Sequence, residues 1–117
     1  MAELVACLGS GKGSWGHVSK LISGQDWDRV FIIADKFFKE KIELGNADII
    51  IIDSDKYLSL MVEDIKNQLK DKIKGIEVAI NLFSGTGKEH MAIVAALLKL
   101  GVGIRLVALT PDGIKEV

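Results

Sequence analysis

The sequence has few of the features that mark secreted, membrane or disulfide-rich proteins. It has one cysteine and one proline, and its apolar stretches fall far short of the roughly 20 residues that a membrane span needs. A single cysteine excludes an intrachain disulfide and favours the cytoplasm. The chain starts without the basic and apolar regions of a secretory signal peptide. A membrane is therefore not an expected partner.

The chain also lacks an excess of charge of either sign, since its 15 Lys+Arg residues nearly balance its 16 Asp+Glu residues. A global basic surface for long nucleic acid is not expected, whereas a small anionic ligand needs only a local positive site. The two histidines lie far apart and no metal-ligand spacing appears, so neither a metal nor another cofactor is predicted. The composition is globular, at 49% hydrophobic and 26% charged residues, and the length predicts one domain over residues 1–117.

Five apolar runs are predicted as buried strands. They are Leu4 to Leu8, Val30 to Ala34, Ala47 to Ile52, Ile76 to Leu82 and Ile104 to Leu109. The residues after the Pro111-Asp-Gly113 turn are expected to form an edge strand or a tail. Strands alternating with helices predict right-handed βαβ crossovers. The expected fold class is α/β, a Rossmann-like three-layer sandwich with a mostly parallel five- or six-stranded sheet and helices on both faces.

Helical patterns fill the intervals between these runs. The predicted helices are His17 to Ser23, Lys36 to Leu44, a long helix whose apolar stripe runs from Leu58 to Ile73, and Glu89 to Leu100. Asp53, Ser54 and Asp55 offer N-cap oxygens to the long helix. The last helix is nearly all apolar, more than one sheet face can cover, which predicts a homodimer.

The first strand is followed by a glycine-rich loop. Gly11-Lys-Gly13-Ser-Trp-Gly16 fits the pattern G-x-G-x-x-G, and Asp35 ends the second strand, where dinucleotide sites place a ribose-binding acid. Glycines let a phosphate approach the backbone, and a helix N-terminus offers N–H groups. A turn without ligand remains an alternative. Trp15 stacks on a base or packs against the sheet edge, and His17 faces the ligand or caps the helix in solvent.

The fourth strand is followed by a second such loop, Ser84 to Lys88. Its hydroxyls, glycine amides and lysine can all donate to an anion at a helix start. Neither loop meets the P-loop pattern G-x-x-x-x-G-K-[ST].

Residues around these loops are expected to be structural. Cys7 is predicted to be a buried, inert strand residue. Phe83 and Met91 are expected in the core, and His90 is expected to be a packed histidine. Asn81 is predicted to hydrogen-bond to neighbouring loop backbone.

The strand end at Asn81, the run Ser-Gly-Thr-Gly-Lys-Glu-His-Met from Ser84 to Met91 and the apolar helix after it resemble the CARF (CRISPR-associated Rossmann fold) domains. The resemblance covers the chain in layout and is strongest from Asn81 to Leu98. It implies a homodimer, active in antiviral defence, that binds cyclic oligoadenylates in an interface pocket formed by the first- and fourth-strand loops. The pocket residues would be Ser10, Gly11, Lys12 and Ser14 with Ser84, Gly85, Thr86 and Lys88; Gly13 and Gly87 complete the predicted ligand-binding set.

Three functions follow as hypotheses. The first is binding of a nucleotide-type anion, specifically a cyclic oligoadenylate, with Asp35 only capping the helix after it. The second is an NAD(P)- or mononucleotide-binding subunit, with Asp35 on a ribose. The third is an interaction subunit without a small ligand. No catalytic residue is assigned, and any turnover is expected to be slow, metal-independent cleavage of the ligand.

Overall fold

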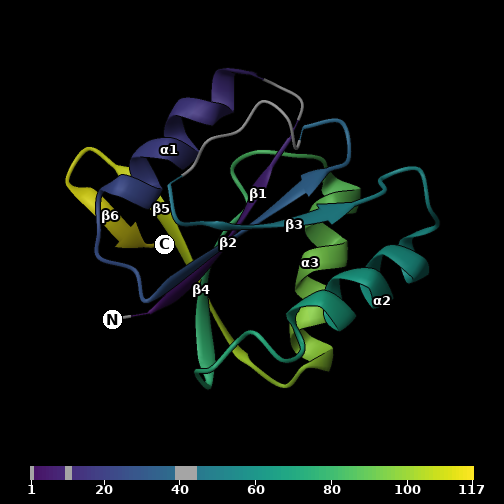
Figure 1. Ribbon diagram of the computed structural model, residues 1–117. Coiled ribbons are helices and arrows are strands. Elements are labelled where there is room, and N and C mark those ends of the chain that lie inside the picture. Colours follow the sequence, from purple (N-terminus) through teal and green to yellow (C-terminus); the bar gives the residue numbers. More distant parts are fainter. Residues whose placement is uncertain (1, 10–11, 39–44) are drawn as a thin grey trace.

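A computed structural model of the chain describes residues 2–9, 12–38 and 45–117, with Lys12 described by its backbone only (Figure 1). Its centre is a six-stranded sheet in the order β3-β2-β1-β4-β5-β6. The strands are β1 (Glu3–Leu8), β2 (Arg29–Asp35), β3 (Asp48–Ile52), β4 (Glu77–Asn81), β5 (Gly103–Thr110) and β6 (Gly113–Glu116). The pairs among β1 to β5 are parallel, and β6 runs antiparallel to β5. The predicted α/β class with a mostly parallel sheet is confirmed.

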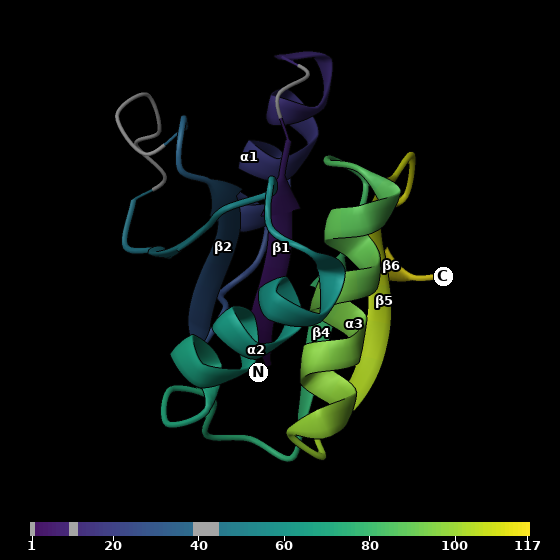
Figure 2. The ribbon, with the colours of Figure 1, turned by 90° about the vertical axis from the view of Figure 1, so that its right-hand side faces the viewer.

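The helices lie on two sides of the sheet. They are α1 (Trp15–Ser23), which continues the 3-10 turn η1 (Lys12–Ser14), α2 (Leu58–Leu69) and α3 (Gly87–Lys99). Successive strand residues point to opposite faces. Val5 and Cys7 of β1 accordingly pack with buried residues of α2 and α3, whereas Leu4, Ala6 and Leu8 pack with those of α1. Figure 2 shows α2 and α3 in front of the sheet and α1 behind it.

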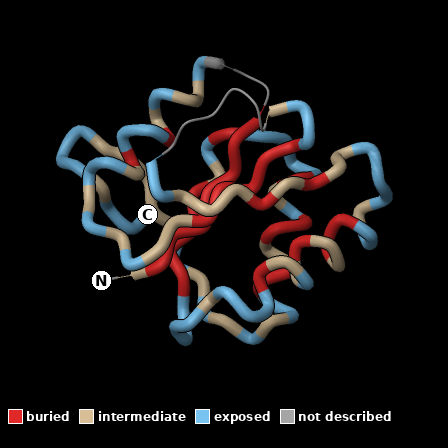
Figure 3. The backbone as a smooth tube through the Cα atoms, in the orientation of Figure 1, coloured by how far each residue is buried: buried red, intermediate tan, exposed pale blue. Residues whose placement is uncertain are grey.

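The strand order reverses between β1 and β4. The chain adds β2 and then β3 on one side of β1 and crosses through α2 to β4 on the other side. The register pairs Glu3 with Val78 and Ala6 with Asn81, so β1 and β4 end at the same edge. Buried residues concentrate in these central strands (Figure 3). Doubly wound sheets bind their ligands at such an edge, next to the reversal.

The start of α2 differs from the prediction. This helix begins at Leu58, and its N-cap residue Tyr57 makes no side-chain capping bond. Asp53 instead accepts a hydrogen bond from the backbone N–H of Asp55 at 3.0 Å and lies 3.3 Å from the ammonium of Lys36. The prediction that residues 53 to 55 cap the helix is wrong, because the chain makes a separate turn there before the helix starts.

The other boundaries agree more closely. Each strand starts and ends within one residue of its predicted run, and α1 and α3 each begin two residues early. Residues 36 to 38 form a turn and a bend rather than the first turn of the predicted helix Lys36 to Leu44, whose residues 39–44 lie outside the described part. Among the described helices, none has the length and apolar character needed to cross a bilayer.

Candidate functional site

The loops after β1 and β4 meet at the carboxyl edge of the sheet. β1 ends at Leu8 and β4 ends at Asn81. Figure 2 shows the start of α1 and the loop before α3 near each other at the upper edge. The predicted ligand residues Ser10 and Gly11 lie outside the described residues, between Gly9 and the turn η1.

Gly9 and Gly85 join the two loops by direct backbone contact. A Cβ built on Gly9 would lie 2.5 Å from the α-carbon of Gly85 and 2.6 Å from its nitrogen. Gly85 has a φ of +106°, and a Cβ there would lie 2.6 Å from Sγ of Cys7. Glycine is therefore required at both positions. Gly9 must leave room for the close approach of Gly85, and Gly85 must leave room for Cys7 and also adopt a positive φ.

Ser84 holds the same two loops together through its side chain. It is buried, and its hydroxyl accepts a hydrogen bond from the backbone N–H of Gly9 at 2.8 Å. The hydroxyl of Ser14 lies 2.6 Å from it. The Ser84 carbonyl accepts from Nε2 of His90 at 2.7 Å, which makes His90 the packed structural histidine that the sequence predicts. The predicted contact of the Ser84 hydroxyl with a ligand stays a prediction, since this hydroxyl serves the loop contact.

The start of α3 is closed by a capping box. Thr86 accepts a hydrogen bond from the backbone N–H of Glu89 at 3.2 Å, and Glu89 Oε1 accepts from the backbone N–H of Thr86 at 2.8 Å. Glu89 is buried, so its carboxylate occupies part of the helix N-terminus that an anion would otherwise use. The exposed residues Gly87 and Lys88 leave the rest of this helix start open.

Cys7 lies beneath this loop contact. Burial, together with the nearby charge of Glu89, raises the pKa of its thiol to about 12. The group is a thiol at neutral pH and therefore a poor nucleophile. The structure thus confirms that Cys7 is a buried strand residue, and its burial predicts low reactivity.

Asp35 and Lys88 converge on Ser54, in the loop after β3. Asp35 is buried and accepts from the backbone N–H of Ser54 at 2.9 Å, from the Ser54 hydroxyl, and from the backbone N–H of Phe37 at 3.3 Å. Lys88 donates to the Ser54 carbonyl at 2.9 Å. Both Asp35 oxygens thus have protein partners, an arrangement that disfavours the ribose-binding role of the dinucleotide hypothesis. The sequence marks Ser54 only as a candidate helix cap, so its links to Asp35 and Lys88 were not predicted.

The start of α1 lacks the acidic residue that the start of α3 carries. A Cβ built on Gly13, Gly16 or Gly87 would meet no heavy atom within 4 Å. Neither η1 nor α1 has an acidic residue in its first turn, whereas α3 carries Glu89 there. An anion can therefore approach the backbone near Gly13 without meeting a carboxylate of that turn.

Trp15 serves packing in this structure. Its Nε1 donates to the carbonyl of Gly9 at 3.0 Å, and its ring meets Phe38 edge-on with centroids 5.7 Å apart. Of the two alternatives for this residue, the arrangement favours packing against the sheet edge.

His17 and Phe83 form a stack beside the loop contact. Their ring centroids lie 3.9 Å apart and their planes differ by 7°. Asn81 lies below, with Nδ2 at 3.2 Å from His17 Nε2 and at 2.9 Å from the carbonyl of Val107. Its Oδ1 accepts from the backbone N–H of Phe83 at 3.3 Å, which confirms the predicted bond to loop backbone. No local pattern could predict a contact between α1 and a residue 64 positions away.

The prediction that Phe83 and Met91 belong to the core is wrong. Phe83 is 62% exposed and Met91 is 60% exposed. Phe83 comes after the last residue of β4, where no sheet face covers it. Met91 lies on the outer side of α3, opposite the residues that face the sheet.

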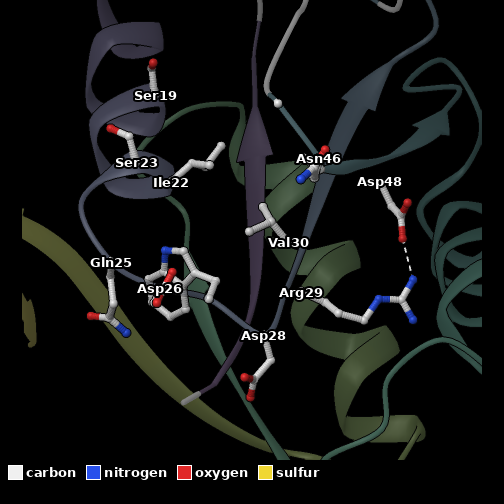
Figure 4. A pocket seen from close by; sticks show the side chains of 13 residues that line it. Ser19, Ile22, Ser23, Gln25, Asp26, Asp28, Arg29, Val30, Asn46 and Asp48 are labelled. Carbon is white, nitrogen blue, oxygen red and sulfur yellow. Dashed lines mark hydrogen bonds and ion pairs between the residues drawn. The ribbon is translucent and has the colours of Figure 1, made fainter.

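A cavity of about 640 Å³ lies at the other end of the strands (Figure 4). It is lined by residues of α1 and of the segments that enter β2 and β3, namely Ser19, Ile22, Ser23, Gln25 to Val30 and Gly45 to Asp48. On its wall Arg29 lies 2.5 Å from Asp48. Because β2 and β3 begin there, this cavity is separate from the loops after β1 and β4.

No protein-family model matches the chain, and no curated protein is significantly similar to it.

Proposed function

We propose that the loops after β1 and β4 bind a nucleotide-type anion. The observation that carries the proposal is the contact of Gly9 with Gly85. It brings two glycine-rich loops together beside the point where the strand order reverses, the usual ligand position in doubly wound sheets. The hydrogen bonds of Ser84 fix the two loops relative to each other, so binding would require little ordering.

The phosphate is proposed to bind nearer to η1 and α1 than to α3. Gly13 is exposed, and the first turn there has no acid, whereas Glu89 already fills part of the α3 start. Backbone N–H groups would bind the phosphate oxygens. Lys12 and Lys88 would add charge, and Lys88 would give up its bond to the Ser54 carbonyl to do so.

The proposed ligand is a cyclic oligoadenylate and the proposed assembly is a homodimer. Residues 81–98 resemble CARF domains, and this resemblance supports the choice of a cyclic oligoadenylate as the ligand. Exposed apolar residues support the dimer: Met91 and Leu98 lie two turns apart on α3, and Leu106 of β5 is 46% exposed. A second copy that covers them would give a two-fold site, suited to a cyclic ligand with repeated units.

A ligand panel with thermal unfolding as the readout tests the proposal. The panel comprises cyclic tri-, tetra- and hexa-adenylate, NAD(H), AMP and pyrophosphate. A ligand at a hundred times its dissociation constant adds about 2.7 kcal/mol of stability, a shift on the order of 10 °C for a domain of this size. A shift with a cyclic oligoadenylate supports the proposal, and a shift with NAD(H) alone supports the dinucleotide hypothesis. If none of them shifts the unfolding temperature, the remaining hypothesis is an interaction subunit without a small ligand.

Turnover is tested separately with labelled cyclic tetra-adenylate and stoichiometric protein, with and without EDTA. The proposed step is attack of a ribose 2′-hydroxyl on the adjacent phosphorus. It forms a 2′,3′-cyclic phosphate, and the proton passes to the departing 5′ oxygen. Equal cleavage in both samples fits this step, and cleavage lost in EDTA contradicts it. Ligand that stays intact after hours limits the function to binding.

A further inference from the structure

Phe83 is an aromatic residue held in place but left in solvent. It is 62% exposed, although one face of its ring is covered by the parallel ring of His17 at 3.9 Å. The exposed surface therefore lies on the opposite face and the edges of the ring. Removal of a phenyl ring from water is favourable. A fixed and exposed ring at a candidate site therefore favours a ligand that covers it.

Asn81 fixes this stack by hydrogen bonds to both of its residues. It is 2% exposed, and the chemistry of its partners determines which atom donates and which accepts in each of its three hydrogen bonds. The Val107 carbonyl can only accept and the Phe83 backbone N–H can only donate, so Nδ2 faces Val107 and Oδ1 faces Phe83. The second hydrogen of Nδ2 then points to Nε2 of His17, which must accept. His17 is thus neutral, with its proton on Nδ1, and cannot turn without losing this bond.

The stack is next to the proposed phosphate site. Phe83 directly precedes Ser84, whose hydroxyl contacts Ser14 at 2.6 Å, and His17 lies one helical turn after Ser14. The pairs Ser14–Ser84 and His17–Phe83 therefore join the same two segments in succession. A nucleotide with its phosphate at the start of α1 would have its base within reach of the Phe83 ring.

We propose that Phe83, supported by His17, is the platform on which a nucleobase of the ligand stacks. This inference rests on the proposed nucleotide function and adds a residue for recognition of the base to it. Stacking on an aromatic ring accepts any base, so specificity among bases would come from other groups. In this arrangement Phe83 touches the ligand, whereas His17 and Asn81 are positioning residues.

The test compares AMP with ribose 5-phosphate, which lacks the base, by NMR shift titration of the ¹⁵N-labelled protein. The variants are Phe83→Leu, which removes the ring, Phe83→Tyr, which keeps it, and Phe37→Leu as a control at another exposed phenylalanine of the same edge. Phe83→Leu is expected to weaken the binding of AMP about 10- to 100-fold and to leave the affinity for ribose 5-phosphate unchanged. Phe83→Tyr and Phe37→Leu are expected to bind both as the wild type does.

Several results would overturn the platform while the anion site stands. They are equal binding of AMP and ribose 5-phosphate by the wild type, equal loss of both in Phe83→Leu, and equal effects of Phe83→Leu and Phe37→Leu. A change of sedimentation mass in Phe83→Leu would instead make the ring an interface residue. If neither phosphate compound binds and no cyclic oligoadenylate of the panel binds, the proposed function fails, and millimolar adenosine decides the platform alone. Ring-current shifts at His17 and Phe83 would support it, and their absence would refute it.

Discussion

The α-carbon of Gly85 lies so close to Gly9 that a Cβ built on Gly9 would be 2.5 Å from it. This contact sets the separation of the two loops, since neither backbone can move closer and the Ser84 hydroxyl keeps them from moving apart. The candidate site is therefore a product of tertiary packing between two segments about 75 residues apart.

Alanine at either contact glycine should destabilise the fold. Gly9→Ala would push the loops apart, and Gly85→Ala would add the strain of a positive φ, with a loss on the order of 3 kcal/mol for each. Gly87→Ala is the matched control, because its Cβ meets nothing and alanine favours a helix start. Urea unfolding measures the difference. Equal stability of Gly9→Ala and Gly87→Ala would show that the loops are not in contact.

Removal of either loop lysine should weaken ligand binding with little effect on the fold. Lys12→Ala and Lys88→Ala each lose one charge-assisted contact, which contributes about 1.5–3 kcal/mol to binding. Lys88 is exposed, so its bond to the Ser54 carbonyl contributes little to stability. Lys115→Ala, on the exposed strand β6, is the control. Normal affinity of Lys88→Ala for a ligand found in the panel would exclude the second loop as the phosphate site.

Asp35→Ala should lower stability and leave ligand affinity unchanged. The carboxylate holds the loops after β2 and β3 through Ser54 and Phe37, and the loss is expected to be about 1–3 kcal/mol. Isothermal titration of the variant measures the affinity. A loss of binding would favour the dinucleotide hypothesis instead.

The same carboxyl should make stability depend on pH in the acid range. Burial raises the pKa of Asp35, but hydrogen bonds from Ser54 and Phe37 and the charge of Lys36 outweigh it and lower the net pKa below 3.8. The stabilisation is therefore present above pH 3.8 and lost as the pH falls through the lowered pKa. In Asp35→Asn this part of the acid dependence should disappear.

His17 should titrate below its usual pKa of 6.5, because burial lowers the pKa of the ring. The folded state then binds its proton less readily than the unfolded state. His17 lowers stability as the pH falls from about 6.5 through the folded pKa and has no such effect above this window. A ¹H–¹³C titration measures the pKa. In His17→Phe, urea unfolding at pH 5.5 and 7.5 should lose this part of the difference, and an unchanged difference would assign it to other groups.

The chain should be a dimer at micromolar concentration, with its interface on the outer side of α3. Leu98→Glu should give monomers, because it puts a charge into the apolar stripe with Met91. Ile76→Glu, at a residue 89% exposed that is not part of α3, should leave the dimer intact. Light scattering gives the mass. A wild-type monomer would contradict the shared-pocket proposal.

The sequence by itself determined the strands, the parallel α/β class and the two loops, because each rests on local patterns. Apolar runs such as Ile104 to Leu109 and glycines such as Gly24 and Gly101 mark where elements begin and end. The capping box at Thr86 is also a local signal, with Glu89 three residues on. This motif places the start of the helix at Gly87, two residues before the predicted start at Glu89.

Only the tertiary structure decided which side chains at these loops face inward. Ser84 is buried and Phe83 beside it is exposed, although the sequence suggested the reverse for both. The reason is that burial past the end of a strand depends on what the neighbouring strand and helix bring there: Gly9 and Ser14 cover Ser84, and nothing in the described chain beyond His17 stacks on Phe83. Likewise the partners of Asp35 and His17 come from segments that only the strand order brings together.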